Sequence, residues 1–201
     1  MAAPAPIVSQ TALSMMSTAL VLAGEKPLNS ITDPRYGAQV VASLFDMVYE
    51  NELQNNPWRF SCKKGQLSRI NQQPINEWKY AWQIPTDCLS MVGFWGVGPD
   101  RLYEIYGNVI YTNISSNPGV AAATLTAEYQ FKPDPSTLPS YFSLLVTLAI
   151  AKHICKPITE SDSARTKCEQ AYEVQRGRAM FADARQRPNR PLQHKPFIQC
   201  R

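Results

Sequence analysis

The sequence predicts an α+β protein: a helical bundle of about four helices with an inserted small antiparallel β-sheet platform and an extended C-terminal arm. Apolar residues recur at helical spacing near the start of the chain and again after residue 138, whereas alternating and aromatic residues fill the segment between. With 201 residues, 44% of them hydrophobic, the chain can bury a substantial core. We expect a helical bundle domain from residues 7–57 and 138–187, a β-rich platform at 58–137 and an arm at 188–201.

The first helix is expected within residues 7–24. Its apolar side chains fall on a single helical stripe, formed by Leu13, Met16, Leu20 and Ala23. Gly24 follows the stripe, in the position of a residue that ends a helix. A signal peptide would need a basic segment before its apolar stretch, but the first positive side chain is Lys26.

The second helix is expected to start at Asp33 and Pro34, because an N-cap acceptor followed by proline is a typical helix start. It should end near Leu53, since Asn55, Asn56 and Pro57 follow. Its helical repeat consists of Val41, Leu44, Phe45, Val48 and Glu52.

A structural joint is predicted where the helical pattern changes to a strand pattern. Trp58 and Phe60 alternate around Arg59, and their size suits them to anchor a strand end in the core. The three residues would fix the sheet to the bundle at a constant angle.

Three segments predict strands of the inserted sheet. In residues 78–85, Trp78, Tyr80 and Trp82 alternate with Lys79, Ala81 and Gln83. Residues 102–113 predict a hairpin with a two-residue turn at Gly107 and Asn108, and residues 124–131 predict a further strand.

Two helices are expected after the sheet. The first runs from Phe142 to Cys155, is apolar almost all the way round and should be the central core element, closed by Pro157. Thr159 and Asp162 resemble a capping signature for the last helix, which should end near Arg187 and Pro188.

Positive charge is concentrated in the last quarter of the chain. The net charge is +4, yet residues 152–201 hold eleven of the twenty Lys and Arg residues and only five of the sixteen Asp and Glu residues. Pro188, Pro191 and Pro196 make the arm too proline-rich for a helix, so we expect an extended segment that docks on a partner. The residues predicted to bind that partner are Arg185, Arg187, Arg190, Lys195, Phe197 and Ile198. A solvated, disordered tail is the alternative.

Motifs for catalysis are missing from the sequence, which has no G-x-G-x-x-G, G-x-x-x-x-G-K-[ST], G-x-S-x-G or H-E-x-x-H. His153 falls in an apolar helix, so we expect a core or boundary imidazole rather than a general base. The five cysteines form no C-x-x-C pair, which predicts buried thiols and a reducing compartment. We expect no enzymatic activity, no cofactor, no metal and no membrane span.

Nucleic-acid binding is the main alternative function. The aromatic residues of 78–85 could stack on bases beside Lys79, and the basic arm could follow phosphates. An aromatic residue at every second position is also what one buried sheet face looks like, and we expect this strip to face a core.

The order of these parts resembles the tail tubular protein A family of short-tailed bacteriophages. The resemblance covers about residues 7–187. It rests on Gly24-Glu25-Lys26-Pro27-Leu28-Asn29-Ser30-Ile31 after the first helix, Pro57-Trp58-Arg59-Phe60 after the second, Leu102-Tyr103-Glu104-Ile105 in the hairpin, and Leu138-Pro139 before the apolar helix.

The resemblance implies a structural virion protein, the head-to-tail adaptor in the neck region of the virion tail, assembled in the host cytoplasm. Members of the family form a ring, usually of twelve copies, beneath the portal protein. They bind the tail nozzle (tail tubular protein B) below and lie near the tail-fibre attachment, and DNA passes through the lumen without specific binding. Such a ring requires that one patch of each copy meets a different patch of the next.

Overall fold

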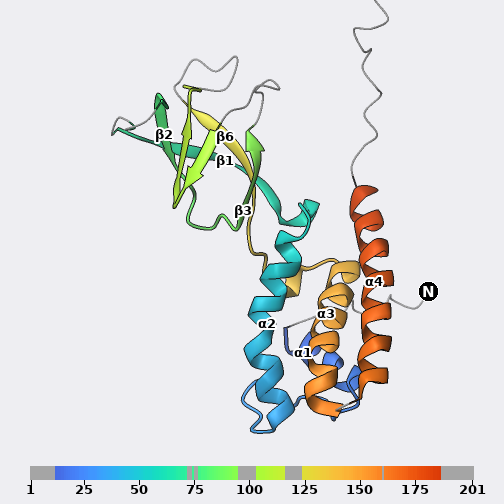
Figure 1. Ribbon diagram of the computed structural model, residues 1–201. Helices are drawn as coiled ribbons and strands as arrows, with labels where there is room; N and C mark the ends of the chain where they lie inside the picture. The colour runs from blue at the N-terminus through green and yellow to red at the C-terminus, as the bar shows by residue number, and fades with distance from the viewer. Residues whose placement is uncertain are drawn as a thin grey trace, which may run out of the picture.

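The computed structural model describes residues 12–71, 74, 77–94, 103–115, 124–159 and 161–186. These residues form four α-helices packed as a bundle and a six-stranded antiparallel sheet at one end of that bundle (Figure 1). The predicted α+β class, the bundle of about four helices and the inserted antiparallel sheet are therefore confirmed. The predicted arm, residues 188–201, lies outside the described residues.

Helix α1 (Ala12–Leu22) ends just before the predicted glycine. Gly24 has a φ of 88°, its N–H donates to Val21 O at 3.0 Å, and the N–H of Glu25 donates to Leu20 O at 2.9 Å. These two hydrogen bonds form the Schellman ending of a helix, which needs a residue with positive φ. The predicted stripe packs inward: Met16, Leu20 and Ala23 are buried and Leu13 is partly buried.

Helix α2 (Tyr36–Gln54) begins later than predicted, with Arg35 rather than Asp33 as its N-cap. The Asp33 carboxylate is engaged elsewhere, because it accepts hydrogen bonds from the backbone N–H of Arg35 at 3.1 Å and from its guanidinium at 2.7 Å. The same guanidinium donates to Lys26 O and Pro27 O. Asp33 therefore orders the turn before the helix and does not cap it.

Helix α3 (Ser140–Thr159) is the central core helix, as predicted, with ten buried residues. It does not end at Pro157 but continues through it to Thr159, because proline already has the φ of a helix and here removes one hydrogen bond from the last turn only. By length and composition α3 could cross a membrane, with a hydropathy of 1.3, although 56% of that window is buried inside the protein. A mostly buried core helix meets the same criterion, so the expectation of no membrane span stays a prediction.

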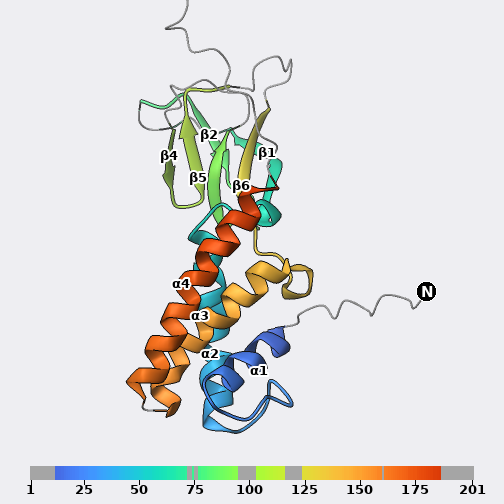
Figure 2. The same cartoon turned by 90° about the vertical axis from the view of Figure 1, so that its right-hand side faces the viewer.

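Helix α4 (Asp162–Ala184) packs along α3. Its N-cap is Ser161, whose Oγ accepts a hydrogen bond from the N–H of Ala164 at 3.3 Å, so the predicted cap at Thr159 is wrong. Thr159 instead belongs to α3, where its hydroxyl donates to Cys155 O. Figure 1 and Figure 2 show α2 and α4 on opposite sides of the bundle.

The sheet contains strands in the order β3-β6-β1-β2-β5-β4, all antiparallel to their neighbours. The strands are β1 (Cys62–Ile70), β2 (Tyr80–Gln83), β3 (Ser90–Phe94), β4 (Tyr103–Tyr106), β5 (Val109–Thr112) and β6 (Leu125–Gln130). The hairpin of β4 and β5 turns at Gly107 and Asn108 as predicted, with a φ of 58° at Gly107. β3 had no counterpart among the predicted strands, and β1 begins after the strand end that was predicted at Trp58 and Phe60.

The sheet curls around a core of its own. Phe94 at the end of β3 and Tyr103 at the start of β4 have ring centroids 4.8 Å apart, which brings the two edge strands together at one end. Two members of the aromatic strip face this core as predicted, because Trp82 is fully buried and Tyr80 packs against the same cluster, whereas Trp78 is buried outside that cluster, before β2. A separate and larger core fills the helical bundle.

Candidate interfaces and the joint between sheet and bundle

Trp58 ties the start of the sheet to the helical core. Its side chain is 1% exposed, its ring lies 5.1 Å from that of Phe142 in α3, and its indole N–H donates to Glu52 O at 2.8 Å. Phe60 packs on Phe142 as well, with centroids 4.8 Å apart. The backbone differs from the prediction, since Arg59–Ser61 form a short 3₁₀ turn and the strand begins only after it.

Arg59 connects this turn to the far end of the chain. Its backbone N–H donates to both carboxylate oxygens of Asp183, at 3.0 and 3.2 Å, and Asp183 lies in the last turn of α4. The Tyr141 hydroxyl donates to the same carboxylate at 3.0 Å. Burial and the nearby Asp183 raise the pKa of Tyr141 above its usual value. Helices α3 and α4 thus hold the same turn.

Gln130 fastens the returning strand β6 to the end of α2. Its side-chain amide is buried and donates to Leu53 O at 3.0 Å and to Asn56 O at 2.8 Å. The next residue, Phe131, donates its backbone N–H to Ser61 O at 2.9 Å. The two chain segments that cross between bundle and sheet are therefore bonded to each other and to α2.

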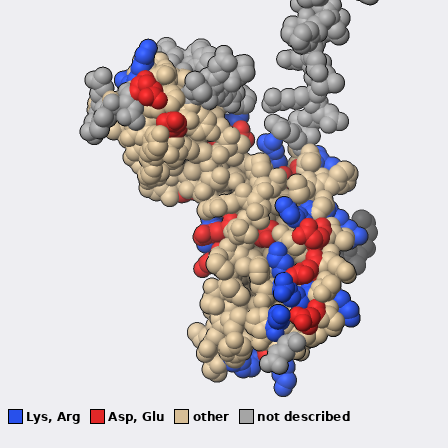
Figure 3. Space-filling view, viewed as in Figure 1, with Lys and Arg blue, Asp and Glu red and all other residues tan. Residues whose placement is uncertain are grey.

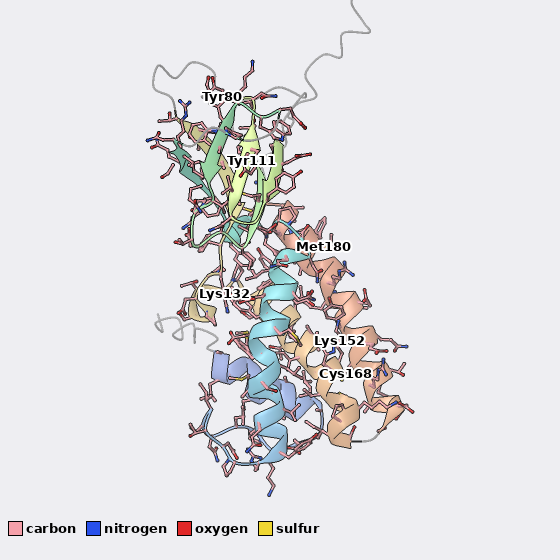
Figure 4. All side chains as sticks on the ribbon, turned by 60° about the vertical axis from the view of Figure 1, so that its left-hand side comes forward. Tyr80, Tyr111, Lys132, Lys152, Cys168 and Met180 are labelled. Atoms are coloured by element: carbon pink, nitrogen blue, oxygen red, sulfur yellow. The ribbon has the colours of Figure 1, made fainter. Side chains whose placement is uncertain are left out.

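Lys132 adds an ionic contact at the same level. Its ammonium lies 3.1 Å from Asp46 and 2.9 Å from Glu50, both on α2 (Figure 4). The hydrogen bond to Glu50, followed by that to Asp46, raises the pKa of Lys132 above its usual value. All three side chains are substantially exposed, so the two ion pairs add little to the free energy of unfolding. Their main effect is to restrain the segment after β6 against α2.

Inside the bundle, a buried carboxylate links α2 to α4. Glu52, 2% exposed, accepts hydrogen bonds from the Tyr172 hydroxyl at 2.9 and 3.1 Å. Burial and the Glu52 carboxylate raise the pKa of Tyr172 above its usual value. The Lys152 ammonium lies 3.5 Å from the centroid of the Tyr172 ring and covers its outer side. All three residues hold the helices in one relative position.

A charged groove runs along the seam between α3 and α4. Its lining includes Lys152, His153, Lys156, Arg165 and Glu169. His153 is exposed there, and partial burial of its ring together with Lys152 and Arg165 lowers its pKa below the usual value. Of the two expected positions, core or boundary, His153 takes the boundary of the bundle, partly covered by its neighbours. Figure 3 shows Lys and Arg mixed with Asp and Glu along this side of the bundle.

The cysteines differ in burial. Cys155 in α3 is buried, and its sulfur lies 3.0 Å from that of Cys168 in α4, whereas Cys62, Cys88 and Cys168 are only partly buried. The predicted burial therefore holds for Cys155 alone among the four described thiols. Within the described residues, no group of three or more His, Cys, Asp or Glu side chains is arranged to hold a metal ion.

Arg185 is the single member of the predicted partner-binding set that the described residues include. It follows α4, is exposed, and stacks its guanidinium 5.7 Å from the ring of the exposed Phe181. The other predicted partner-binding residues, which lie outside the described residues, are Arg187, Arg190, Lys195, Phe197 and Ile198.

Two residues of the joint were missed by the sequence analysis, namely Asp183 and Gln130. Each is polar and sits in an otherwise unremarkable segment, and its partners are distant along the chain. The buried hydrogen bond of Glu52 could have been predicted, because Glu52 occupies a core position of the α2 repeat, where a carboxylate requires a buried partner.

No protein-family model matches the chain, and no curated protein matches it at a significant level. The resemblance to the tail tubular protein A family therefore stays a prediction.

Proposed function

We propose that the protein is a structural virion protein, a head-to-tail adaptor of a short-tailed bacteriophage. In this proposal, copies form a ring, of about twelve by the family resemblance, that joins the portal protein to the tail nozzle in the neck of the tail. DNA passes through the lumen of the ring without specific binding.

The observation that carries the proposal is the joint between sheet and bundle. Helices α2, α3 and α4 each bind the short segment around Trp58, Arg59 and Gln130 through buried aromatic contacts and hydrogen bonds. An adaptor that contacts one neighbour through its helices and another through its sheet needs both parts at one fixed angle, since angular errors accumulate around a ring.

The surface of the described residues also suits an assembled protein. Large apolar side chains are exposed on all four helices and on strands β3 and β4, including Tyr36, Met47, Tyr106, Val174 and Phe181. Where such side chains share one face, as Val174 and Phe181 do on α4, the apolar patch favours a protein contact.

The test combines native mass spectrometry with negative-stain microscopy of the purified protein, alone and mixed with the portal protein of the same phage. A ring that stacks coaxially on the portal is the expected result. A protein that neither forms a ring nor binds the portal would overturn the proposal.

Nucleic-acid binding remains the second candidate, favoured by the positive charge of residues 152–201. It predicts binding to duplex DNA by the isolated protein that weakens steeply with added salt. The same preparation can be titrated with duplex DNA at two salt concentrations, and such binding without portal binding would favour this candidate.

A further inference from the structure

The outer face of α4 carries a glycine that neither the backbone conformation nor the packing of a single copy requires. Gly177 lies inside α4 and is not among the glycines with positive φ. A Cβ added at this position would meet no atom within 4 Å. Glycine inside a helix lowers stability relative to alanine, and its usual benefit is the close approach of another group. That group is missing among the described residues.

Exposed apolar side chains form the walls of this notch. Val174, 55% exposed, precedes Gly177 by three residues, and Phe181, 66% exposed, follows it by four, which places all three on one face of the helix. Alongside, Leu144 and Leu148 of α3 extend the apolar surface as a groove between the two helices.

One cation adjoins the notch. Arg178 follows Gly177 in α4 and has no described carboxylate within 4.0 Å. It therefore offers positive charge to a partner without first breaking an ion pair. Lys167 lines the same groove, but it lies ten residues before Gly177, about 15 Å along the helix. The partner that fits has an apolar knob bordered by acidic side chains.

Helix α2 has this composition on its outer face. Met47 is 62% exposed, Glu50 follows it by three residues on the same face, and Asp46 lies one turn before Glu50. Between Tyr36 and Gln54 the helix contains no Lys or Arg. Lys132 neutralises only part of this acidic charge, because it faces two carboxylates.

We infer that the notch at Gly177 receives Met47 of a second copy of this chain, with the acidic pair Asp46 and Glu50 of that copy facing Arg178. The inference rests on the proposed ring and assigns its subunit contact. Because α2 and α4 lie on opposite sides of the bundle (Figures 1 and 2), each copy can offer both surfaces at once. Such a heterologous contact propagates from copy to copy until it closes.

The first test uses Gly177→Ala and Gly177→Leu. In the unassembled protein, Gly177→Ala should raise the Tm by about 2–4 °C, because alanine favours the helix. Gly177→Leu should nevertheless raise the concentration needed for half-assembly by roughly tenfold or more, because the notch is filled. Arg176→Leu is the matched control, since it adds an apolar side chain one residue away on a different face and should leave assembly unchanged.

The second test is a disulfide cross-link between copies. A double variant with Met47→Cys and Val174→Cys should give a ladder of covalent oligomers after mild oxidation, whereas the wild-type protein, with its own five cysteines, and each single variant should not give this ladder. Exchange of charge supplies a complementary readout. Arg178→Asp and Asp46→Arg should each weaken assembly, and their combination should restore part of it.

The outcomes separate the interface from the adaptor function. A ring on the portal that is unaffected by Gly177→Leu would overturn the interface and leave the adaptor function standing. A cross-linked ladder without portal binding would support the interface and overturn the adaptor function. Cross-links from position 174 only within one chain, to residues 188–201, would show that the arm covers the notch and would also overturn the interface.

Discussion

The backbone N–H of Arg59 donates a bifurcated hydrogen bond to the two carboxylate oxygens of Asp183, a residue 124 positions later in the chain. Asp183 lies at the end of α4, and Arg59 lies in the turn that leads into β1. The turn that follows the first helical segment and the last turn of the final helix therefore meet where the sheet begins.

Replacing Asp183 should destabilise the protein strongly. In Asp183→Ala the N–H of Arg59 and the hydroxyl of Tyr141 lose their shared acceptor in a mostly buried site, and we expect a loss of about 2–4 kcal/mol in the free energy of unfolding. Asp183→Asn keeps one acceptor oxygen, so the loss in the free energy of unfolding should be smaller. Urea denaturation followed by circular dichroism measures both, and a loss below about 0.5 kcal/mol for the alanine variant would contradict the assigned role.

Truncation of Trp58 should have a similar cost for a different reason. Trp58→Ala removes a fully buried aromatic ring from contact with Phe142 and should cost about 3–5 kcal/mol. Trp58→Phe keeps an aromatic ring but loses the hydrogen bond to Glu52 O, so a smaller cost is expected. Ring assembly should fall with Trp58→Ala, and an unchanged melting temperature would be the contrary result.

The buried tyrosines should make the fold sensitive to alkali. Burial raises the pKa of Tyr49, Tyr141 and Tyr172 above 10.0 in the folded protein. Above that pH the unfolded chain loses these phenolic protons while the folded chain keeps them, so stability is complete below pH 10 and falls as the pH rises. Absorbance titration of phenolate, compared between native and urea-unfolded protein, should show delayed ionisation of these tyrosines. Identical phenolate titration curves for native and urea-unfolded protein would refute this prediction.

Thiol labelling should discriminate among the cysteines. Burial, followed by the contact with Cys168, raises the pKa of Cys155 above its usual value, so little thiolate is present at pH 8. Iodoacetamide should label Cys155 slowly in the native protein and rapidly in urea, as measured by peptide mass spectrometry. Cys168→Ser is the control, and Cys155 should stay slow in it because burial is the main cause. Rapid native labelling of Cys155 would show that the α3–α4 seam opens.

Removal of residues 188–201 should separate folding from docking. The joint and both cores lie within residues 12–186, so the truncated protein should keep the wild-type Tm. It should bind the portal more weakly if Phe197, Ile198 and the basic residues make the contact. Replacing only the basic residues of the arm with Gln is the matched variant for the charge, and equal portal binding by truncated and full-length protein would refute the docking role.

Local sequence was sufficient for elements whose determinants lie close together in the chain. Gly24 ends α1, the Gly107-Asn108 turn joins β4 to β5, and the repeat from Val41 to Glu52 buries one face of α2, all as predicted. Backbone conformation and helical period act over a few residues, so they can be identified from sequence. Local competition caused the errors at Asp33 and Thr159, where each side chain has a different hydrogen-bond partner from the one its cap signature implied.

The sequence by itself therefore determined the fold class, the position of the inserted sheet and the identity of Trp58 as a core anchor. Only the tertiary structure decided how the sheet is held, through Asp183 with Arg59, Gln130 with Leu53 and Glu52 with Tyr172. The partners in these pairs are 77 to 124 residues apart. A polar residue in the sequence does not identify its distant partner, because the hydrogen bond exists only after both segments have packed and lost their contact with water.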